Sequence, residues 1–202
     1  MQPFEKVTGI AAPLLAANID TDVIMPKQFL KGIDRNGLDR GVFFDLRFLP
    51  DGEKNPAFIL NQPPWHQPTF LVVGPNFGCG SSREHAVWGL KQLGIRALIG
   101  TRFAGIFFDN CQRNGVLLIQ LEENELKRIG QRVSDPEQAE IRIDLVAQHI
   151  TLADGSTLAF EVDALRRESL FQGLDAIGST LQRAEMIRTF EAEHLRANPW
   201  LA

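Results

Sequence analysis

Short apolar runs alternate with longer helical segments in the middle third of the chain. The runs at 69–74, 97–100 and 116–119 have the length and composition of buried strands. Between them, residues 82–93 and 104–114 have helical spacing, and each segment is followed by a glycine, the residue that most often ends a helix. This strand–helix–strand–helix–strand series predicts a parallel sheet with right-handed crossovers.

The period of the pattern changes after a charged helix expected at 122–133. Apolar and polar residues alternate in three runs between residues 141 and 162, which predicts strands with one buried face. Asp154-Gly155 separates the last two runs and is a hairpin turn signal. From residue 163 onward the chain has helical spacing again, so we expect a helical C-terminal arm over 163–202.

The first third of the chain is expected to be irregular. Prolines and glycines interrupt residues 26–68, and little fits between them beyond short strands such as 57–60. The fold class that follows is α/β: a single domain over 1–202, with a core at about 5–165. It has a mixed, partly parallel sheet flanked by helices, an added β hairpin and the helical arm.

Composition narrows the function classes. The chain has 202 residues, 44% hydrophobic and 23% charged, with a net charge of −4 and no basic block, which argues against nucleic-acid binding. We find no apolar stretch long enough to span a bilayer. The early apolar segment 9–18 contains Pro13 and lacks a basic lead-in, so it is not expected to act as a signal peptide. We therefore expect a cytoplasmic protein without a membrane partner.

Two cysteines, Cys79 and Cys111, make no disulfide framework. They also fall short of the four thiolates that usually hold an iron–sulfur cluster. Chemistry that needs such a cluster would require another chain to supply it.

The segment Gly78-Cys79-Gly80-Ser81-Ser82-Arg83 carries the candidate chemistry, because it lies where a strand turns into a helix. Backbone N–H groups and the positive end of the helix dipole suit an anion there. A serine at such a place can react, and an arginine can hold a carboxylate through two parallel hydrogen bonds.

Three other interpretations of this segment compete with that of an anion-binding turn. Ser81 and Glu84 have the spacing of a capping box, with Ser81 as N-cap. A dinucleotide-binding fingerprint would need a glycine where Arg83 stands and an acidic residue where Thr101-Arg102 follow the next strand. A hydrolase elbow needs the pattern G-x-S-x-G, which this segment does not have.

The segment also resembles a family signature. Gly78–Ala86 is similar to the signature in the last domain of aconitase-type dehydratases, 103–115 resembles a stretch that follows it there, and 18–26 resembles the opening segment. The tail 173–181 is similar to the small subunits of bacterial 3-isopropylmalate dehydratases. The three blocks occur in the family's order, and the likeness extends over nearly the whole chain.

This resemblance implies a swivelling domain on a chain of its own, which closes over a large partner subunit. The partner holds a [4Fe-4S] cluster, and this chain binds no cofactor or metal itself. Together they isomerise 2-isopropylmalate to 3-isopropylmalate, a dicarboxylate substrate and product, by removing and re-adding water. The resemblance makes Ser81 the catalytic base. It assigns substrate binding to Arg83, to Ser82 beside it, and to Arg35 as the family's upstream arginine.

The other polar residues have structural interpretations. We expect His85 and Cys79 to be packing residues and Cys111 to be core. Whether Asp109 and Asn110 help to position the turn from the next helix stays open on the sequence alone. The spacing of Asn18, Asp20 and Asp22 is that of a calcium loop, but the required glycine and terminal glutamate are absent, so these residues are expected to shape a turn. Several phenylalanines are expected in the core or at a partner interface: Phe43, Phe44, Phe48, Phe103, Phe107 and Phe108.

Two alternatives stay open on the sequence alone. The substrate could be the related acid of a citramalate or homoaconitate dehydratase, with discriminating contacts in 26–68. The turn could instead be a non-catalytic anion-binding nest.

Overall fold

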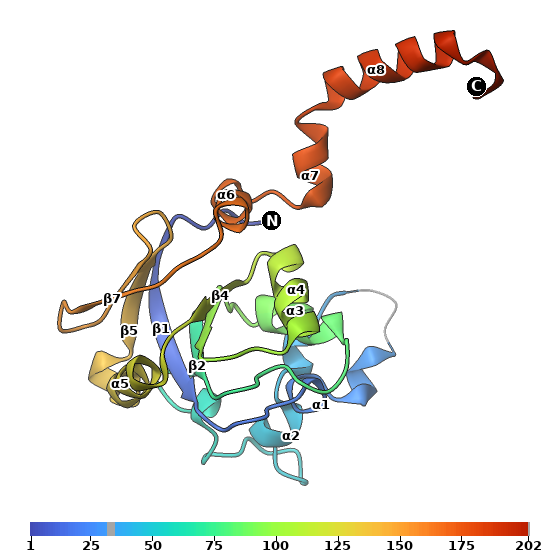
Figure 1. Ribbon diagram of the computed structural model, residues 1–202. Coiled ribbons are helices and arrows are strands. Elements are labelled where there is room, and N and C mark those ends of the chain that lie inside the picture. Colours follow the sequence, from blue (N-terminus) through green and yellow to red (C-terminus); the bar gives the residue numbers. More distant parts are fainter. Residues whose placement is uncertain (32–34, 202) are drawn as a thin grey trace.

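The computed structural model describes residues 1–31 and 35–201. Its centre is a seven-stranded sheet in the order β4-β3-β2-β1-β5-β6-β7 (Figure 1). β1 to β4 are mutually parallel, and β5 to β7 continue the sheet antiparallel. The strands are β1 (Lys6–Leu14), β2 (Phe70–Val73), β3 (Ala97–Gly100), β4 (Leu117–Gln120), β5 (Glu140–Asp144), β6 (His149–Thr151) and β7 (Thr157–Ala159). The predicted mixed α/β sheet is confirmed.

Helices cover both faces of this sheet and form the C-terminal arm. The α-helices are α1 (Thr21–Ile24), α2 (Phe44–Arg47), α3 (Glu84–Gln92), α4 (Gly105–Asn114), α5 (Glu123–Val133), α6 (Ala164–Gln172), α7 (Ala176–Leu181) and α8 (Ala184–Ala197). Short 3-10 helices lie at Lys27–Leu30, Leu38–Gly41, Ile59–Asn61, Pro136–Gln138 and Pro199–Leu201. The predicted helix-and-strand series of the middle third is confirmed to within two residues at each boundary.

The expectation of an irregular first third is wrong for β1. This strand changes partner along its length: residues 6–10 pair antiparallel with β5, and residues 11–14 pair parallel with β2. It therefore joins the two halves of the sheet. Its small residues hide it from a hydrophobicity pattern, yet they are needed, because a side chain at Gly9 would collide with Thr69 on the neighbouring chain segment. The strand predicted at 57–60 is also wrong, since that segment is a turn followed by a 3-10 helix.

Two apolar cores lie on opposite faces of the sheet. Alternate residues of β2, such as Leu71 and Val73, point to the core shared with α3 and α4. Phe70 and Val72 point to the core shared with α5, with β5–β7 and with Leu170 of α6. Successive side chains along a strand face opposite sides of the sheet, so each parallel strand is buried on both of its faces. The turn after β2 is thus anchored by a strand that cannot shift without disturbing both cores.

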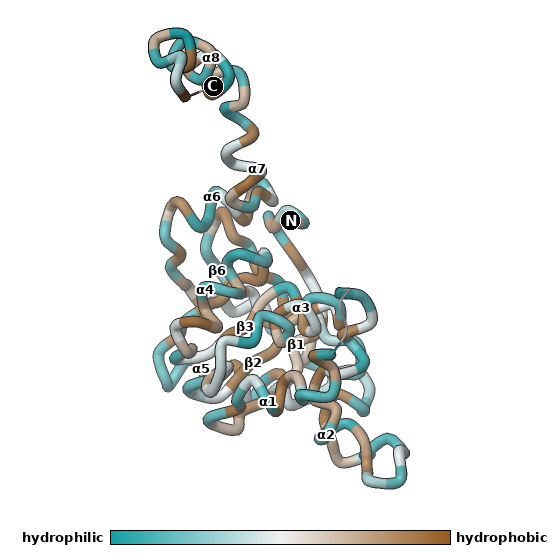
Figure 2. The backbone as a smooth tube through the Cα atoms, turned by 90° about the vertical axis from the view of Figure 1, so that its right-hand side faces the viewer, coloured by the Kyte–Doolittle hydropathy of each residue, from teal (hydrophilic) through white to brown (hydrophobic). Residues whose placement is uncertain are grey.

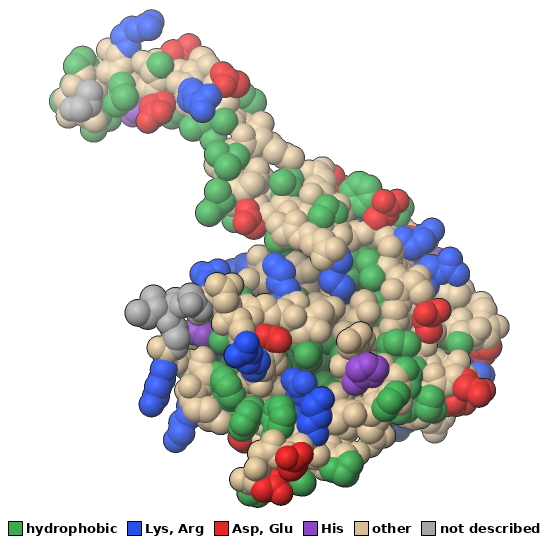
Figure 3. Space-filling model, turned by 180° about the vertical axis from the view of Figure 1, so that it is seen from behind, with side chains coloured by type: hydrophobic (Ala, Val, Ile, Leu, Met, Phe, Trp, Pro, Cys, Tyr) green, Lys and Arg blue, Asp and Glu red, His purple; other side chains and the backbone are tan. Residues whose placement is uncertain are grey.

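The segment predicted as an arm divides into two parts. α6 packs on the body through Leu170, which is 4% exposed. α7 and α8 reach away from the body (Figures 1 and 2), and every residue of both helices is at least partly exposed. Figure 3 shows hydrophobic side chains, in green, on this part of the chain. The large exposed apolar residues of α7, α8 and the 3-10 helix after them are Ile177, Leu181, Met186, Ile187, Phe190, Trp200 and Leu201.

Candidate active site

Backbone hydrogen bonds hold the turn after β2 between two other segments of the chain. Gly78 N–H donates to the carbonyl of Ile19 at 2.8 Å, and Thr21 N–H donates to the carbonyl of Cys79 at 2.9 Å. On the other side, Ala104 N–H donates to the carbonyl of Phe77 at 3.2 Å. The three sequence blocks that carry the family resemblance therefore meet at the carboxyl end of the parallel strands.

Glycine is required at both ends of Cys79. Gly78 has φ +76°, and a Cβ there would lie 2.1 Å from Cγ of Phe107, far inside contact distance. Gly80 has φ +94°, with the Cβ of Asp20 at 3.3 Å from the position of a Cβ. A left-handed backbone of this kind favours glycine, so the two glycines let the turn lie directly on α4 and on the segment before α1.

The capping box, one of the interpretations that competed for this segment, is wrong. α3 begins at Glu84, its N-cap is Arg83, and no side chain caps it by a hydrogen bond. Ser81 and Ser82 precede the helix rather than start it, and both are exposed. Ser81 is therefore not engaged as a cap. Ala86 N–H donates to the carbonyl of Arg83 at 3.2 Å, and within the described residues the N–H groups of Glu84 and His85 are left for an anion.

The hydroxyl of Ser81 instead meets the hydroxyl of Thr21. The two oxygen atoms are 3.0 Å apart. Thr21 Oγ1 also accepts a hydrogen bond from Ser81 N–H at 3.2 Å, and it lies within donating distance, 3.2 Å, of the Ser81 carbonyl oxygen. Thr21 is 1% exposed. Ser81 therefore has one side held by a buried hydroxyl and the other side open to solvent.

Arg83 forms an ion pair through Nη1 with the carboxylate of Asp22. Its side chain is 23% exposed and that of Asp22 is 55% exposed. A guanidinium carries five N–H donors, and in the described part of the chain we find no further partner for Nε or Nη2. Nε and Nη2 make up one of the guanidinium edges that can bind a carboxylate through two parallel hydrogen bonds.

Glu84, which would reach back to the turn in a capping box, contacts α4 instead. Its carboxylate accepts a hydrogen bond from Asn114 Nδ2 at 2.7 Å, and Asn114 Oδ1 accepts one from Trp88 Nε1 at 3.1 Å. The indole can only donate and a carboxylate can only accept, so these partners fix the orientation of the amide. The pair ties the first two turns of α3 to the end of α4.

Arg35 contacts α3 through the side chain of Trp88. The guanidinium of Arg35 lies 4.0 Å from the centre of the indole ring, a distance typical of a cation–π contact. The ring of His85 lies against the same indole at 4.6 Å. Arg35 is thus stacked one turn into α3, the helix whose first turn follows Arg83, and it is exposed to solvent.

The remaining candidates have structural surroundings. Cys111 is fully buried in α4, as expected, and burial raises the pKa of its thiol well above the usual value. Cys79 is half-buried. Asn110 is 6% exposed and its carbonyl accepts from Asn114 Nδ2 at 2.8 Å, whereas Asp109 is exposed. Of the phenylalanines expected in the core or at an interface, Phe43, Phe103 and Phe107 are buried, and the other three are half-buried.

Within residues 1–31 and 35–201, no group of three or more His, Cys, Asp or Glu side chains could hold a metal ion. No helix of the described chain is long and apolar enough to cross a membrane.

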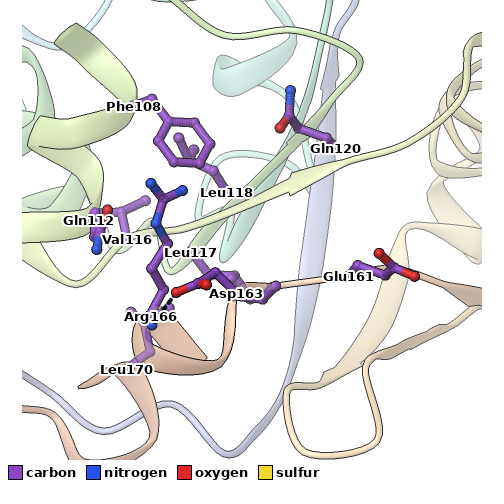
Figure 4. A pocket seen from close by; sticks show the side chains of 11 residues that line it. Phe108, Gln112, Val116, Leu117, Leu118, Gln120, Glu161, Asp163, Arg166 and Leu170 are labelled. Atoms are coloured by element: carbon purple, nitrogen blue, oxygen red, sulfur yellow. Dashed lines mark hydrogen bonds between the residues drawn. The ribbon is translucent and has the colours of Figure 1, made fainter. Parts of the chain in front are cut away.

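A cavity elsewhere on the body is separate from this turn. It has a volume of about 180 Å³ and lies between β4, α4 and α6. Figure 4 shows Arg166 reaching toward the ring of Phe108 across it, with the guanidinium 4.7 Å from the ring centre. Neither serine of the turn lines this cavity, nor does Arg83. The cavity is small, and Arg166 and Phe108 line one side of it.

Comparison with known proteins finds relatives along the whole chain. A family model described as the aconitase C-terminal domain matches residues 1–124, LeuD_N matches 128–164, and the C-terminal domain of the 3-isopropylmalate dehydratase small subunit matches 177–202. The chain is 62% identical to 3-isopropylmalate dehydratase small subunit 1 of Mannheimia succiniciproducens, over 100% of this chain and 99% of that protein. It is 57% identical to small subunit 2 of Salmonella typhimurium, over 100% and 96%.

This chain belongs to the 3-isopropylmalate dehydratase small-subunit family. The crystal structure of 3-isopropylmalate dehydratase (leuD) from Methanocaldococcus jannaschii superposes with a TM-score of 0.68 at 28% identity, over 92% of this chain and 99% of that one. The resemblance found in the sequence is therefore confirmed, and so is the fold class. As a small subunit of this hydro-lyase, the chain acts with a large subunit.

Sequence reasoning missed Thr21 and Asp22, two residues of this dehydratase family member that contact the predicted site. The segment around them was expected to shape a turn, and Asp20 does so, because its side chain accepts from Val23 N–H at 2.8 Å. Thr21 and Asp22 contact Ser81 and Arg83 instead. The signal available in the sequence was only that Asn18–Pro26 belongs to the same family pattern as the turn.

Proposed function

We propose that this chain supplies a serine base and a carboxylate-binding arginine to the active site that it forms with the large subunit. The reaction removes water from 2-isopropylmalate and adds it back at the neighbouring carbon, giving 3-isopropylmalate for leucine biosynthesis. The observation that carries the proposal is the placement of the Ser81 hydroxyl, 3.0 Å from the Thr21 hydroxyl, in a glycine-framed turn two residues before Arg83.

Ser81 would take the proton from the substrate carbon. A serine alkoxide is normally too basic to form near neutral pH, so its surroundings must stabilise the negative charge. The uncapped first turn of α3 provides N–H groups and the positive end of a helix dipole. Closure of a swivelling domain over the large subunit would exclude water from the open side of Ser81 and strengthen these interactions.

The arginines would hold the two carboxylates of the substrate. Arg83 has its Nη1 fixed by Asp22, so its other edge is preorganised for one carboxylate. Ser82 is exposed beside it and would donate a hydrogen bond to the same carboxylate. Arg35, stacked on Trp88, would bind a carboxylate from the side of α3. Because two fixed cations select for two negative charges, this arrangement suits a dicarboxylate.

The [4Fe-4S] cluster is assigned to the large subunit. The residues of this chain do not fit such a group, because one of its two cysteines is buried in the core, with a raised thiol pKa. When bound by the partner, the cluster would supply Lewis-acid assistance to the leaving hydroxyl. We place the complex in the cytoplasm, whose reducing conditions suit free thiols.

The test is turnover of 2-isopropylmalate by the reconstituted complex with Ser81→Ala. Loss of a general base predicts a fall in kcat of about 10²- to 10⁴-fold, with co-elution of the two subunits unchanged. Ser156→Ala is the matched control, since Ser156 lies in the β6–β7 hairpin and its side chain bonds only to Asp154 within the described residues.

Turnover of the Ser81→Ala complex within a factor of three of the unmodified complex would remove Ser81 from the mechanism. Assaying citramalate beside 2-isopropylmalate tests the substrate, and a higher kcat/KM for citramalate would overturn that assignment while leaving the role of Ser81 standing.

A further inference from the structure

The hydroxyl of Thr21 touches every polar atom of Ser81. Its Oγ1 lies 3.0 Å from Ser81 Oγ, 3.2 Å from the Ser81 carbonyl oxygen and 3.2 Å from Ser81 N. Thr21 is also 1% exposed, one of two buried polar residues in the described part of the chain. Burying a hydroxyl is unfavourable unless it is hydrogen-bonded, and all of the bonds found for this hydroxyl go to one residue.

The backbone keeps Thr21 in this place. Thr21 N–H donates to the Cys79 carbonyl, and Asp20 pairs with Cys79 in a short parallel bridge. Asp20 also caps α1 by accepting from Val23 N–H. A threonine is β-branched and therefore stiff about χ1. With its backbone tied to the turn itself, a change of χ1 that took its hydroxyl away from Ser81 would leave that hydroxyl buried without these hydrogen bonds.

A hydroxyl has one hydrogen to donate and two lone pairs. Ser81 N–H uses one lone pair of Thr21 Oγ1. While Ser81 is protonated, its O–H can donate to the second lone pair, and the Thr21 hydrogen can point to the Ser81 carbonyl oxygen. When Ser81 has lost its proton, the alkoxide needs a donor, and the Thr21 hydrogen reaches it by rotation alone.

We propose that Thr21 is a catalytic hydrogen-bond donor that stabilises the alkoxide form of Ser81. The inference rests on the proposed role of Ser81 as the base. As the substrate C–H bond breaks, the proton passes to Ser81 Oγ, the electron pair forms the carbon–carbon double bond, and hydroxide leaves from the neighbouring carbon. Thr21 gains and loses no proton, and its hydrogen turns from Ser81 Oγ to the Ser81 carbonyl oxygen.

The ion pair of Asp22 distinguishes the proposed role of Thr21 from that of its neighbour. Asp22 follows Thr21 directly and pairs with Arg83 rather than with Ser81. Consecutive residues of α1 thus support the two proposed functions separately, one the base and the other the carboxylate-binding arginine. Loss of the Thr21 hydroxyl should therefore change proton transfer and leave carboxylate binding unchanged.

The experiment compares Thr21→Val, Thr21→Ser and Thr180→Val in complex with the large subunit. Valine keeps the shape and removes the hydroxyl. We expect Thr21→Val to lower kcat about 10²-fold, the effect of losing one donor to a developing oxyanion, with KM for 2-isopropylmalate changed less than threefold. Thr21→Ser keeps the hydroxyl and should retain at least a third of the turnover. Thr180, whose hydroxyl bonds within the exposed α7, is the control.

The pH profile separates this role from simple packing. Without the donor, the alkoxide is harder to form, so the rising limb of kcat/KM against pH should move to higher pH in Thr21→Val and return in Thr21→Ser. The ionisable groups around the turn are present in all variants, so they do not cause the shift: Asp20, Asp22, Cys79, Arg83, Glu84 and His85.

Normal turnover in Thr21→Val would overturn the inference, and so would equal loss in Thr21→Ser or a loss confined to KM. If Thr21→Val does not fold, Thr21→Ala replaces it under the same expectations. The Ser81→Ala result keeps the two proposals apart: an inactive Ser81→Ala complex beside a fully active Thr21→Val complex refutes only the role of Thr21.

Discussion

Replacing Gly78 by alanine tests how closely the turn lies on α4. The new Cβ would stand 2.1 Å from Cγ of Phe107 and 2.4 and 2.6 Å from the two Cδ atoms. Reaching ordinary carbon–carbon contact would move the ring by about 1 Å or more. Phe107 is only 2% exposed and its ring meets the edge of Phe77 at 5.6 Å, so a displaced ring has no solvent to move into.

Two contributions set the expected magnitude. A side chain in the left-handed region costs about 1–2 kcal/mol, and overpacking a filled core costs about 1–3 kcal/mol more. Gly78→Ala should therefore lower the free energy of unfolding by about 2–5 kcal/mol. Gly155 has nearly the same φ, +80° against +76°, and nothing within 4 Å of a Cβ. Gly155→Ala is thus the matched control, and should show only the first contribution.

The assay is urea unfolding of the isolated chain, where a change in midpoint at constant slope measures the change in stability. The difference between the two variants isolates the collision with Phe107 and should be at least about 1 kcal/mol. If Gly78→Ala costs no more than Gly155→Ala, then α4 does not support the turn. Packing against α4 would then not be what holds Ser81 in position.

Two further predictions concern regions away from the turn. Truncation after Gly173 removes α7 and α8, whose residues are all at least partly exposed, so the free energy of unfolding of the isolated chain should change by less than about 1 kcal/mol; a loss of several kcal/mol would show that the arm packs on the body. The pKa of Asp144 is lowered by the Ala147 N–H and by Lys6, so its charged form contributes stability above the ordinary carboxyl pKa. That contribution, well under about 1 kcal/mol for a surface pair, should disappear in acid as the pH falls through the lowered pKa. Asp144→Asn should therefore differ from the unmodified chain in urea unfolding at pH 7 but not at pH 2, and a constant difference would contradict the argument.

The parallel half of the fold was predictable because its signals are local. β2, β3 and β4 are continuous apolar runs buried on both faces, and Gly115 ends α4 in the left-handed region, as its position after the helix indicates. β1 lacked such a signal. Its small residues lie where other segments of the chain pack directly against them, as Thr69 does against Gly9. The order of hydrophobic and polar residues along the chain does not reveal such tertiary contacts.

The candidate site shows the same division. The motif identified the turn, whereas the spacing of Ser81 and Glu84 also allowed a capping box, which tertiary contacts override. Glu84 bonds to Asn114, thirty residues later, and Ser81 meets Thr21, sixty residues earlier. A capping box describes what two side chains do when nothing else competes for them. Here other partners are present, Asn114 for Glu84 and Thr21 for Ser81.

The two sides of Ser81 differ, and on the proposed mechanism this difference would make its role as a base depend on the large subunit. On the buried side, the hydroxyl of Thr21, a residue that is 1% exposed, already lies in hydrogen-bonding position, so only its hydrogen has to turn when charge develops. On the open side, Ser81 is exposed, and water screens the helix dipole and Arg83 alike. An alkoxide gains from preorganised donors only where water is excluded. The isolated chain should therefore be inactive for a reason beyond the missing cluster, since the environment proposed to make Ser81 a base would be complete only when the large subunit covers the turn.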